Sequence, residues 1–171
     1  MTSTLDLDRL IRLYKLEPLP GEGGLFRQTW VSPYQASLPA ENTPRPQGTA
    51  IFYLLTDQPG SFSALHRLPI DEIWHFYLGD PLEMILLYPD GHSSQVMLGQ
   101  DVFAGQQLQW IVPAGVWQGT RLAEGGHFAL AGTTMAPGFI PSDLELGVRA
   151  ALVETYPQAR RQIQALTRSG E

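Results

Sequence analysis

Segments rich in strand-forming residues recur along most of this chain at a spacing of about ten residues, which limits the folds open to it. Turn signals such as Gly79-Asp80-Pro81 and Pro89-Asp90-Gly91 separate them. The expected strands are 25–31, 49–55, 61–68, 72–78, 83–88, 95–98, 107–112, 118–122 and 127–134. Because no helical pattern lies between them, the sequence predicts an antiparallel sandwich or barrel and not a parallel sheet.

Helical patterns are expected only near the two ends of the chain. Apolar residues at i, i+3, i+4 and i+7 predict a helix over residues 4–16, with Thr4 as its N-cap. After Pro141, Ser142 is expected to cap a short helix, and Pro157 to open a last one. The proline-rich stretch 33–47 is interpreted as a surface loop.

The length of 171 residues, with 43% apolar and 16% charged residues, suits one globular domain. We expect a single domain over 1–171, with a barrel at about 22–140 and a helical segment at about 142–168. The net charge is −6 and Lys15 is the only lysine, so a nucleic-acid partner is not expected.

Because no targeting or membrane-spanning segment is recognised, we expect a soluble cytoplasmic protein. The first residues include Asp6 and Asp8 and lack the apolar core of a signal peptide. No apolar run approaches the roughly 18 residues of a membrane span, so no membrane partner is expected. The chain has no cysteine, which fits a reducing compartment and excludes thiolate metal sites and cysteine nucleophiles.

Candidate chemistry concentrates between residues 66 and 79. With the period of two of a strand, one face carries His66, Leu68, Glu72, Trp74 and Phe76, and the other carries Ile73, His75 and Tyr77. An acid and a base among aromatic walls are typical of a small-molecule pocket. We expect His75, on the opposite face, to pack or to form a hydrogen bond there.

The spacing His-x-Leu-x3-Glu-x6-Gly, from His66 to Gly79, resembles the first motif of the cupin superfamily, His-x-His-x3 or x4-Glu-x6-Gly. The run Pro113-Ala-Gly-Val-Trp-Gln118 resembles the second motif, Pro-x-Gly-x2-His, except at its last position. The whole chain is similar to one branch of that superfamily, a domain of unknown function that resembles metal-free sugar-epimerase-like cupins. Its matching segments are 22–27, 66–67, 71–77, 79–82, 113–118 and 136–139.

The resemblance implies an all-β double-stranded β-helix, or jelly roll, with a ligand cavity inside the barrel. It also implies a homodimer in which N-terminal strands are exchanged. Two of the four usual metal-ligand positions are altered, since Leu68 and Gln118 stand where the family has histidines. No cofactor is therefore favoured, and any divalent metal would depend on His66, Glu72 and Gln118, a poor set for zinc or ferrous iron.

The leading hypothesis is a small-molecule-binding cupin that carries out metal-independent, epimerase- or isomerase-like proton transfer on a polar metabolite. His66, which titrates near neutrality unless perturbed, and Glu72 would be its catalytic groups. The ligand-binding candidates are Trp74, Phe76, Gln118, Thr120 and Arg27. Two alternatives stay open: a metal-dependent dioxygenase- or isomerase-type cupin, and a non-catalytic binding or storage-like protein.

Overall fold

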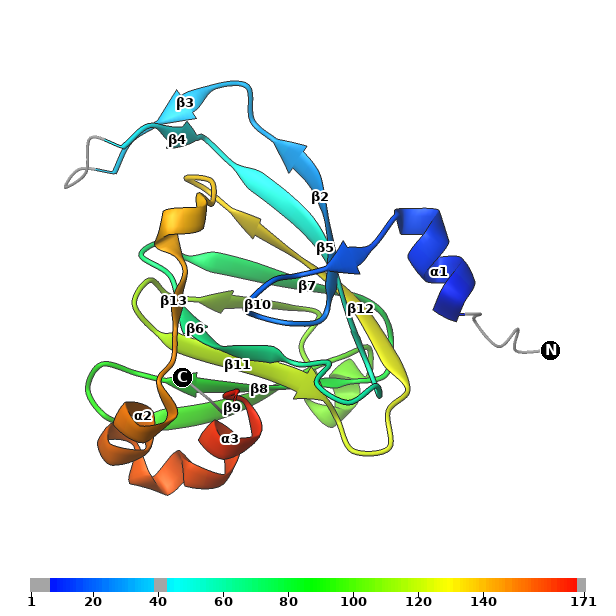
Figure 1. Ribbon diagram of the computed structural model, residues 1–171. Helices are drawn as coiled ribbons and strands as arrows, with labels where there is room; N and C mark the ends of the chain where they lie inside the picture. The colour runs from blue at the N-terminus through cyan, green and yellow to red at the C-terminus, as the bar shows by residue number, and fades with distance from the viewer. Residues whose placement is uncertain (1–6, 39–42, 169–171) are drawn as a thin grey trace.

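The computed structural model describes residues 7–38 and 43–168, in which two antiparallel sheets face each other as a jelly roll (Figure 1). The six-stranded sheet runs in the order β1 (Glu17–Pro18), β2 (Leu25–Val31), β5 (Thr49–Thr56), β12 (Phe128–Met135), β7 (Glu72–Gly79) and β10 (Gln109–Val112). The five-stranded sheet runs β13 (Glu145–Leu146), β6 (Ser63–Arg67), β11 (Trp117–Leu122), β8 (Leu82–Leu87) and β9 (Ser93–Leu98). The predicted all-β jelly-roll architecture is confirmed.

Every strand that the sequence predicted is present, with ends that differ by no more than two residues. The alternation on β7 is also as predicted, because Glu72, Trp74 and Phe76 are buried between the sheets. His75 lies on the outer face, where its Nε2 is 2.9 Å from the Thr134 hydroxyl. The two-residue strands β1 and β13 were not predicted, since so short a segment carries no periodicity.

The stretch 33–47 is not simply a loop. Its two-residue strands β3 (Gln35–Ala36) and β4 (Arg45–Pro46) pair antiparallel and extend from the barrel (Figure 1). The Arg45 guanidinium donates two hydrogen bonds, of 2.6 and 3.2 Å, to the Asp143 carboxylate, and both side chains are almost fully buried. This bidentate pair ties β4 to the segment that follows β12.

The N-terminal helix α1 (Leu7–Tyr14) packs its apolar face on the outside of the six-stranded sheet, as its pattern predicted. The proposed cap Thr4 lies outside the described residues. Helices α2 (Arg149–Thr155) and α3 (Arg160–Ala165) cover the five-stranded sheet (Figure 1). None of the described helices has the length and apolar character that a bilayer crossing needs.

Three short 3-10 turns complete the fold: η1 (Val102–Ala104), η2 (Pro141–Asp143) and η3 (Pro157–Ala159), the last leading into α3. The prediction that Ser142 caps a helix is wrong, because Ser142 lies inside η2. There the Asp143 carboxylate accepts a bond of 3.4 Å from the Ile140 amide. The cap is thus supplied from within the turn by a side chain already bonded to Arg45.

The space between the sheets is filled unequally along the barrel. Strand register places Glu72 beside Met135 at one end of β7, and Gly79 beside Ala129 at the other. At the second end, which we call the closed end, buried apolar side chains pack together; they include Leu55, Phe76, Leu82, Met84 and Leu98. At the first end, which we call the cavity end, the sheets enclose an open volume.

Candidate ligand-binding site

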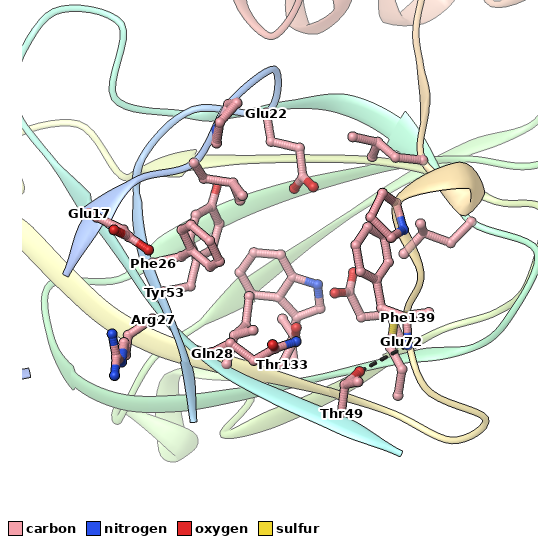
Figure 2. A pocket seen from close by; sticks show the side chains of 18 residues that line it. Glu17, Glu22, Phe26, Arg27, Gln28, Thr49, Tyr53, Glu72, Thr133 and Phe139 are labelled. Carbon is pink, nitrogen blue, oxygen red and sulfur yellow. Dashed lines mark hydrogen bonds between the residues drawn. The ribbon is translucent and has the colours of Figure 1, made fainter. Parts of the chain in front are cut away.

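A cavity of about 610 Å³ occupies the cavity end of the barrel (Figure 2). Its walls are largely apolar and aromatic, formed by residues of β2, β5, β7 and β12 and of the segment 139–144; they include Phe26, Ile51, Tyr53, Trp74, Met135 and Phe139. Three carboxyl groups, Glu17, Glu22 and Glu72, also line it. An apolar volume with a few convergent polar groups is the common form of a small-molecule site.

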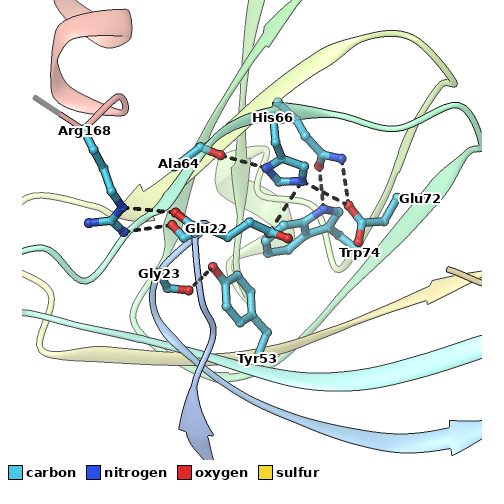
Figure 3. Close-up of polar contacts among 10 residues, drawn as sticks. Glu22, Gly23, Tyr53, Ala64, His66, Glu72, Trp74 and Arg168 are labelled. Atoms are coloured by element: carbon cyan, nitrogen blue, oxygen red, sulfur yellow. Dashed lines mark hydrogen bonds and ion pairs between the residues drawn. The ribbon is translucent and has the colours of Figure 1, made fainter. Parts of the chain in front are cut away.

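At the inner end of the cavity, an imidazole lies behind two of these carboxyl groups and between them (Figure 3). The Nε2 atom of His66 lies 3.7 Å from Glu22 Oε2 and 3.9 Å from Glu72 Oε2. His66 Nδ1 lies 2.7 Å from the Ala64 carbonyl oxygen, which can only accept, so Nδ1 carries a hydrogen. Nε2 is therefore the nitrogen that faces the two carboxyl groups.

The charge state of His66 follows from these neighbours. Burial alone lowers its pKa, but the charge of Glu22, the interaction with Glu72 and the Ala64 carbonyl together raise the pKa of His66 to about 9. His66 is thus an imidazolium at neutral pH. The sequence-based expectation, titration near neutrality unless perturbed, meets its exception here, because Glu22 and Glu72 supply the perturbation.

The environment also shifts the pKa values of the two carboxyl groups in opposite directions. Burial raises the pKa of Glu22, the nearby charge of Glu72 adds to this, and His66 compensates only in part. Burial also disfavours ionisation of Glu72, but His66, Thr133 and Gln118 outweigh it, so the pKa of Glu72 is lowered. Glu72 is therefore the more readily ionised carboxyl group of the pair, and Glu22 the more readily protonated one.

Gln118 connects the tryptophan wall to this cluster. Its carbonyl oxygen accepts a hydrogen bond of 2.9 Å from Trp74 Nε1, and its amide nitrogen donates one of 2.7 Å to Glu72 Oε2. Both ends of the amide are therefore occupied, and Trp74 fixes which end faces Glu72. Gln118 orients the carboxylate and does not itself line the cavity.

The loop that carries Glu22 is held by the C-terminal segment. Arg168 donates to the carbonyl oxygens of Gly21 (3.1 Å) and Glu22 (2.9 Å), and the Tyr53 hydroxyl donates to that of Gly23 (2.7 Å) (Figure 3). Gly23 has φ of 98°, and a Cβ there would lie 2.0 Å from the Arg168 guanidinium and 2.6 Å from the Phe62 carbonyl oxygen. Glycine is required at this position both by conformation and by space.

The other predicted ligand-binding residues are dispersed. Trp74 lines the cavity, whereas Phe76 lies in the core beyond it. Thr120 is fully buried and is not a lining residue, and its hydroxyl makes no hydrogen bond to another described residue. Arg27 lines the cavity but is exposed, on the same side as Glu17 (Figure 2). Arg67, which does not line the cavity, forms an ion pair with Glu145, with 2.6 Å between Arg67 Nε and Glu145 Oε2.

The donor set does not suit the divalent metal that the fold family implies. Leu68 is buried and apolar at one ligand position, and both polar atoms of Gln118 are engaged at another. The one imidazole has Nδ1 bonded to a carbonyl and Nε2 directed at two carboxyl groups. Within residues 7–38 and 43–168, no group of three His, Cys, Asp or Glu side chains has the arrangement of a metal site.

Sequence reasoning did not assign Glu22, Tyr53 or Thr133 to the site, although all three line the cavity. One signal was available for Glu22. The Glu22-Gly23-Gly24 run is part of the family resemblance, and both glycines have positive φ. An acidic residue before two glycines in that conformation indicates a tight loop built to hold a carboxylate in place.

Comparisons with known proteins match this architecture. Residues 8–147 match the family described as Cupin superfamily (DUF985). The Saccharomyces cerevisiae protein described as Uncharacterized protein YML079W is 32% identical over 130 residues, which cover 69% of this chain and 64% of that protein. The match therefore spans less than two thirds of the yeast protein.

Solved structures give the same result. A hypothetical protein from Leishmania major has a TM-score of 0.85 at 30% identity, with 94% of this chain and 97% of that chain covered. Protein SO0799 from Shewanella oneidensis has a TM-score of 0.85 at 34% identity, with 98% of this chain and 100% of that chain covered.

More distant structures share the fold alone. Bacillus subtilis oxalate decarboxylase has a TM-score of 0.54 at 15% identity, covering 88% of this chain and 37% of that one. A dTDP sugar isomerase from Desulfovibrio desulfuricans has a TM-score of 0.50 at 19% identity, covering 78% and 80%. With a family match over residues 8–147 and a barrel of the expected topology, the chain belongs to the cupin superfamily.

Proposed function

We propose that this protein binds a small polar metabolite at the cavity end and moves a proton on it without a metal, in an epimerase- or isomerase-like reaction. The observation that carries this is the position of His66, whose Nε2 lies within 4 Å of both Glu22 and Glu72 beside a 610 Å³ cavity. Pairs of titratable groups with divergent pKa values are the usual sign of an acid and a base in one site.

The proposed step uses the two carboxyl groups in different roles. Glu72, ionised because its pKa is lowered, takes a proton from a carbon next to a carbonyl group of the ligand. Glu22, whose pKa is raised, returns a proton to the resulting enolate at the same carbon or at its oxygen. The C–H bond that breaks is thus replaced by a new C–H or O–H bond, with no oxidant or reductant.

His66 completes the cycle in this proposal. After one turnover Glu72 is protonated and Glu22 is ionised, so one proton must pass between them. The Nε2–H of His66, 3.7 and 3.9 Å from the two carboxyl groups, would give its proton to Glu22 first and then take one from Glu72. His66 does not line the cavity, so it acts on the carboxyl groups and not directly on the ligand.

The walls that contact the substrate would be Trp74, Phe26 and Phe139, whose flat faces suit a ring or chain laid across the cavity.

We further propose a cytoplasmic homodimer, with β2 as the region where a second copy binds. Residues 27–31 of β2 are exposed, and the ladder to β1 covers only Leu25 and Phe26. Native mass spectrometry at micromolar concentration should give a dimer mass, whereas a strict monomer would contradict this part of the proposal.

The reaction is tested by hydrogen exchange in D₂O. Aldoses, amino sugars, hydroxy acids and amino acids are incubated with the protein, and loss of a C–H signal beside a carbonyl group is followed by NMR. We expect at least one compound to exchange, with the rate reduced by at least about 100-fold in Glu72→Gln, the size usual for loss of a general base. A Glu124→Gln variant, at an exposed turn, is the control.

Two results would contradict the proposal. One is that no compound exchanges its C–H proton faster with the folded protein than with a heat-unfolded sample of the same protein. The other is that a compound exchanges equally fast in wild type and in Glu72→Gln. Stabilisation of the fold by a compound that does not exchange would instead support the non-catalytic binding alternative.

A further inference from the structure

The cavity carries more acidic than basic groups, and this difference restricts what can enter it. Among the described residues that line it, three are glutamates and one, Arg27, is basic. Arg27 is exposed, whereas Glu72 is buried and the Glu22 side chain is only 15% exposed. Arg27 is therefore at the solvent side together with the exposed Glu17, whereas two carboxyl groups lie at the inner end with His66 between them.

The positive groups behind the inner end are already engaged. His66 Nε2 is shared between Glu22 and Glu72, and His66 Nδ1 is bonded to the Ala64 carbonyl. The Arg168 guanidinium donates to the carbonyl oxygens of the glutamate loop and stacks on the Phe62 ring at 4.6 Å. Neither cation presents a free N–H to a ligand in the cavity.

The remaining polar atoms of the inner wall are mainly acceptors. The oxygens of Glu22 and Glu72 face the cavity (Figure 2). The Thr49 hydroxyl accepts a bond of 3.0 Å from the Phe139 amide and keeps its own hydrogen as a donor. The Tyr53 hydroxyl lies in the wall, but it donates its hydrogen to the Gly23 carbonyl oxygen and so offers only an acceptor to a ligand. A ligand thus meets carboxyl oxygens between aromatic walls, an arrangement that favours hydrogen-bond donors and repels anions.

We infer that the ligand enters with a hydrogen-bond-donor head group, a hydroxyl or an ammonium, and that phosphorylated or carboxylate-headed compounds are rejected at the inner end. This rests on the ligand pocket of the proposed function but not on its proton transfer. The class is therefore free hydroxylated or amino compounds with an apolar or ring-shaped body, and not nucleotide-linked or phosphorylated ones. Any anionic group in the ligand has to stay at the mouth beside Arg27.

The test uses three probes of one shape and different charge: 2-phenylethanol, 2-phenylethylammonium and phenylacetate. Binding to the full-length protein is measured by NMR titration at low ionic strength, where charge effects are least screened. We expect phenylacetate to bind at least about tenfold more weakly than the better of the other two, a difference of about 1.4 kcal/mol. The tighter binder of 2-phenylethanol and 2-phenylethylammonium then shows whether the site prefers a hydroxyl or an ammonium head group.

Variants locate the effect. Glu72→Gln keeps the shape of the side chain and removes its charge, so the gap between phenylacetate and 2-phenylethanol should shrink to less than about threefold. Glu22→Gln should shrink it by less, because the pKa of Glu22 is raised, and serves if Glu72→Gln fails to fold. Glu124→Gln removes the same charge from an exposed turn and should leave the gap unchanged, which controls for the overall charge of −6.

The inference is overturned if phenylacetate binds as well as the other probes or better, or if none of the three shows saturable binding. It is also overturned if Glu124→Gln narrows the gap as much as Glu72→Gln. The outcome is separate from that of the exchange experiment. A protein that exchanges C–H protons yet prefers phenylacetate keeps the proposed function and loses this inference, and one that prefers the donor probes without exchange does the reverse.

Discussion

The two ends of the barrel are built on the same strands but have opposite characters. Along β7 the inward side chains pass from Glu72 through Trp74 to Phe76, from the cavity end to the closed end. The closed end is filled by apolar groups that need only shape to fit. The cavity end holds an ion-paired cluster around His66, whose members are satisfied by one another. A strand can thus carry a core and a site on one face, because the partners across the barrel decide which it becomes.

The largest expected effect is on stability at the closed end. Phe76→Ala should lower the free energy of unfolding by about 3–5 kcal/mol, since it removes a buried ring from close packing. The matched change Phe139→Ala, in the half-buried wall of the cavity, should cost less than about half of that. Urea denaturation of both variants checks this, and equal losses would mean that the two ends do not differ in packing.

The second effect is a pH dependence that only the cavity end should show. Because the pKa of His66 is raised from 6.5 to about 9 in the folded protein, its stabilising contribution is complete below pH 6.5 and is lost as pH rises through 9. The groups that face the imidazole are Glu22, Glu72 and the Ala64 carbonyl. The loss amounts to at most about 3 kcal/mol.

The measurement is the free energy of unfolding at intervals between pH 6 and 10, for wild type and for His66→Gln. The difference between the two proteins should fall over this range. A constant difference would show that His66 is not held as an imidazolium by its two carboxyl neighbours.

The third prediction concerns Gln118, whose amide joins Trp74 to the Glu72 carboxylate at the cavity end. Gln118→Met keeps the volume but leaves the Trp74 N–H without an acceptor and removes a donor from Glu72, so it should cost about 2 kcal/mol. Met84→Leu, a change of similar size at the closed end, should cost less than about 1.5 kcal/mol. Thermal melting of both variants compares them, and a neutral Gln118→Met would show that the amide bonds contribute little.

The smallest expected effect is at Thr120, a buried hydroxyl with no hydrogen bond to another described residue. Thr120→Val should change the stability by less than about 1 kcal/mol, in either direction, because no protein partner is lost. Chemical denaturation measures it. A loss of more than about 2 kcal/mol would mean that the hydroxyl is part of the cluster at the cavity end and not of the filled core.

Local patterns in the sequence account for much of this molecule. The period of two placed Glu72 and Trp74 on the inner face of β7, and the turn signals located the strand ends within two residues. These predictions succeed because strand alternation is a property of the backbone and does not depend on what lies opposite. The short strands β3 and β4 were not foreseen, since they are stabilised by a contact between Arg45 and Asp143, which are distant in the sequence.

The tertiary structure alone decided which residues form the site. Glu22 meets His66 only because Arg168, near the other end of the chain, and Tyr53 hold its loop over the inner end of the barrel. It also decided that Trp74 lines the cavity whereas Phe76 does not, although both point inward and belong to the same buried cluster. Which side a residue faces is set by its neighbours in the chain, whereas its charge state and partners are set by residues that folding brings within a few ångströms.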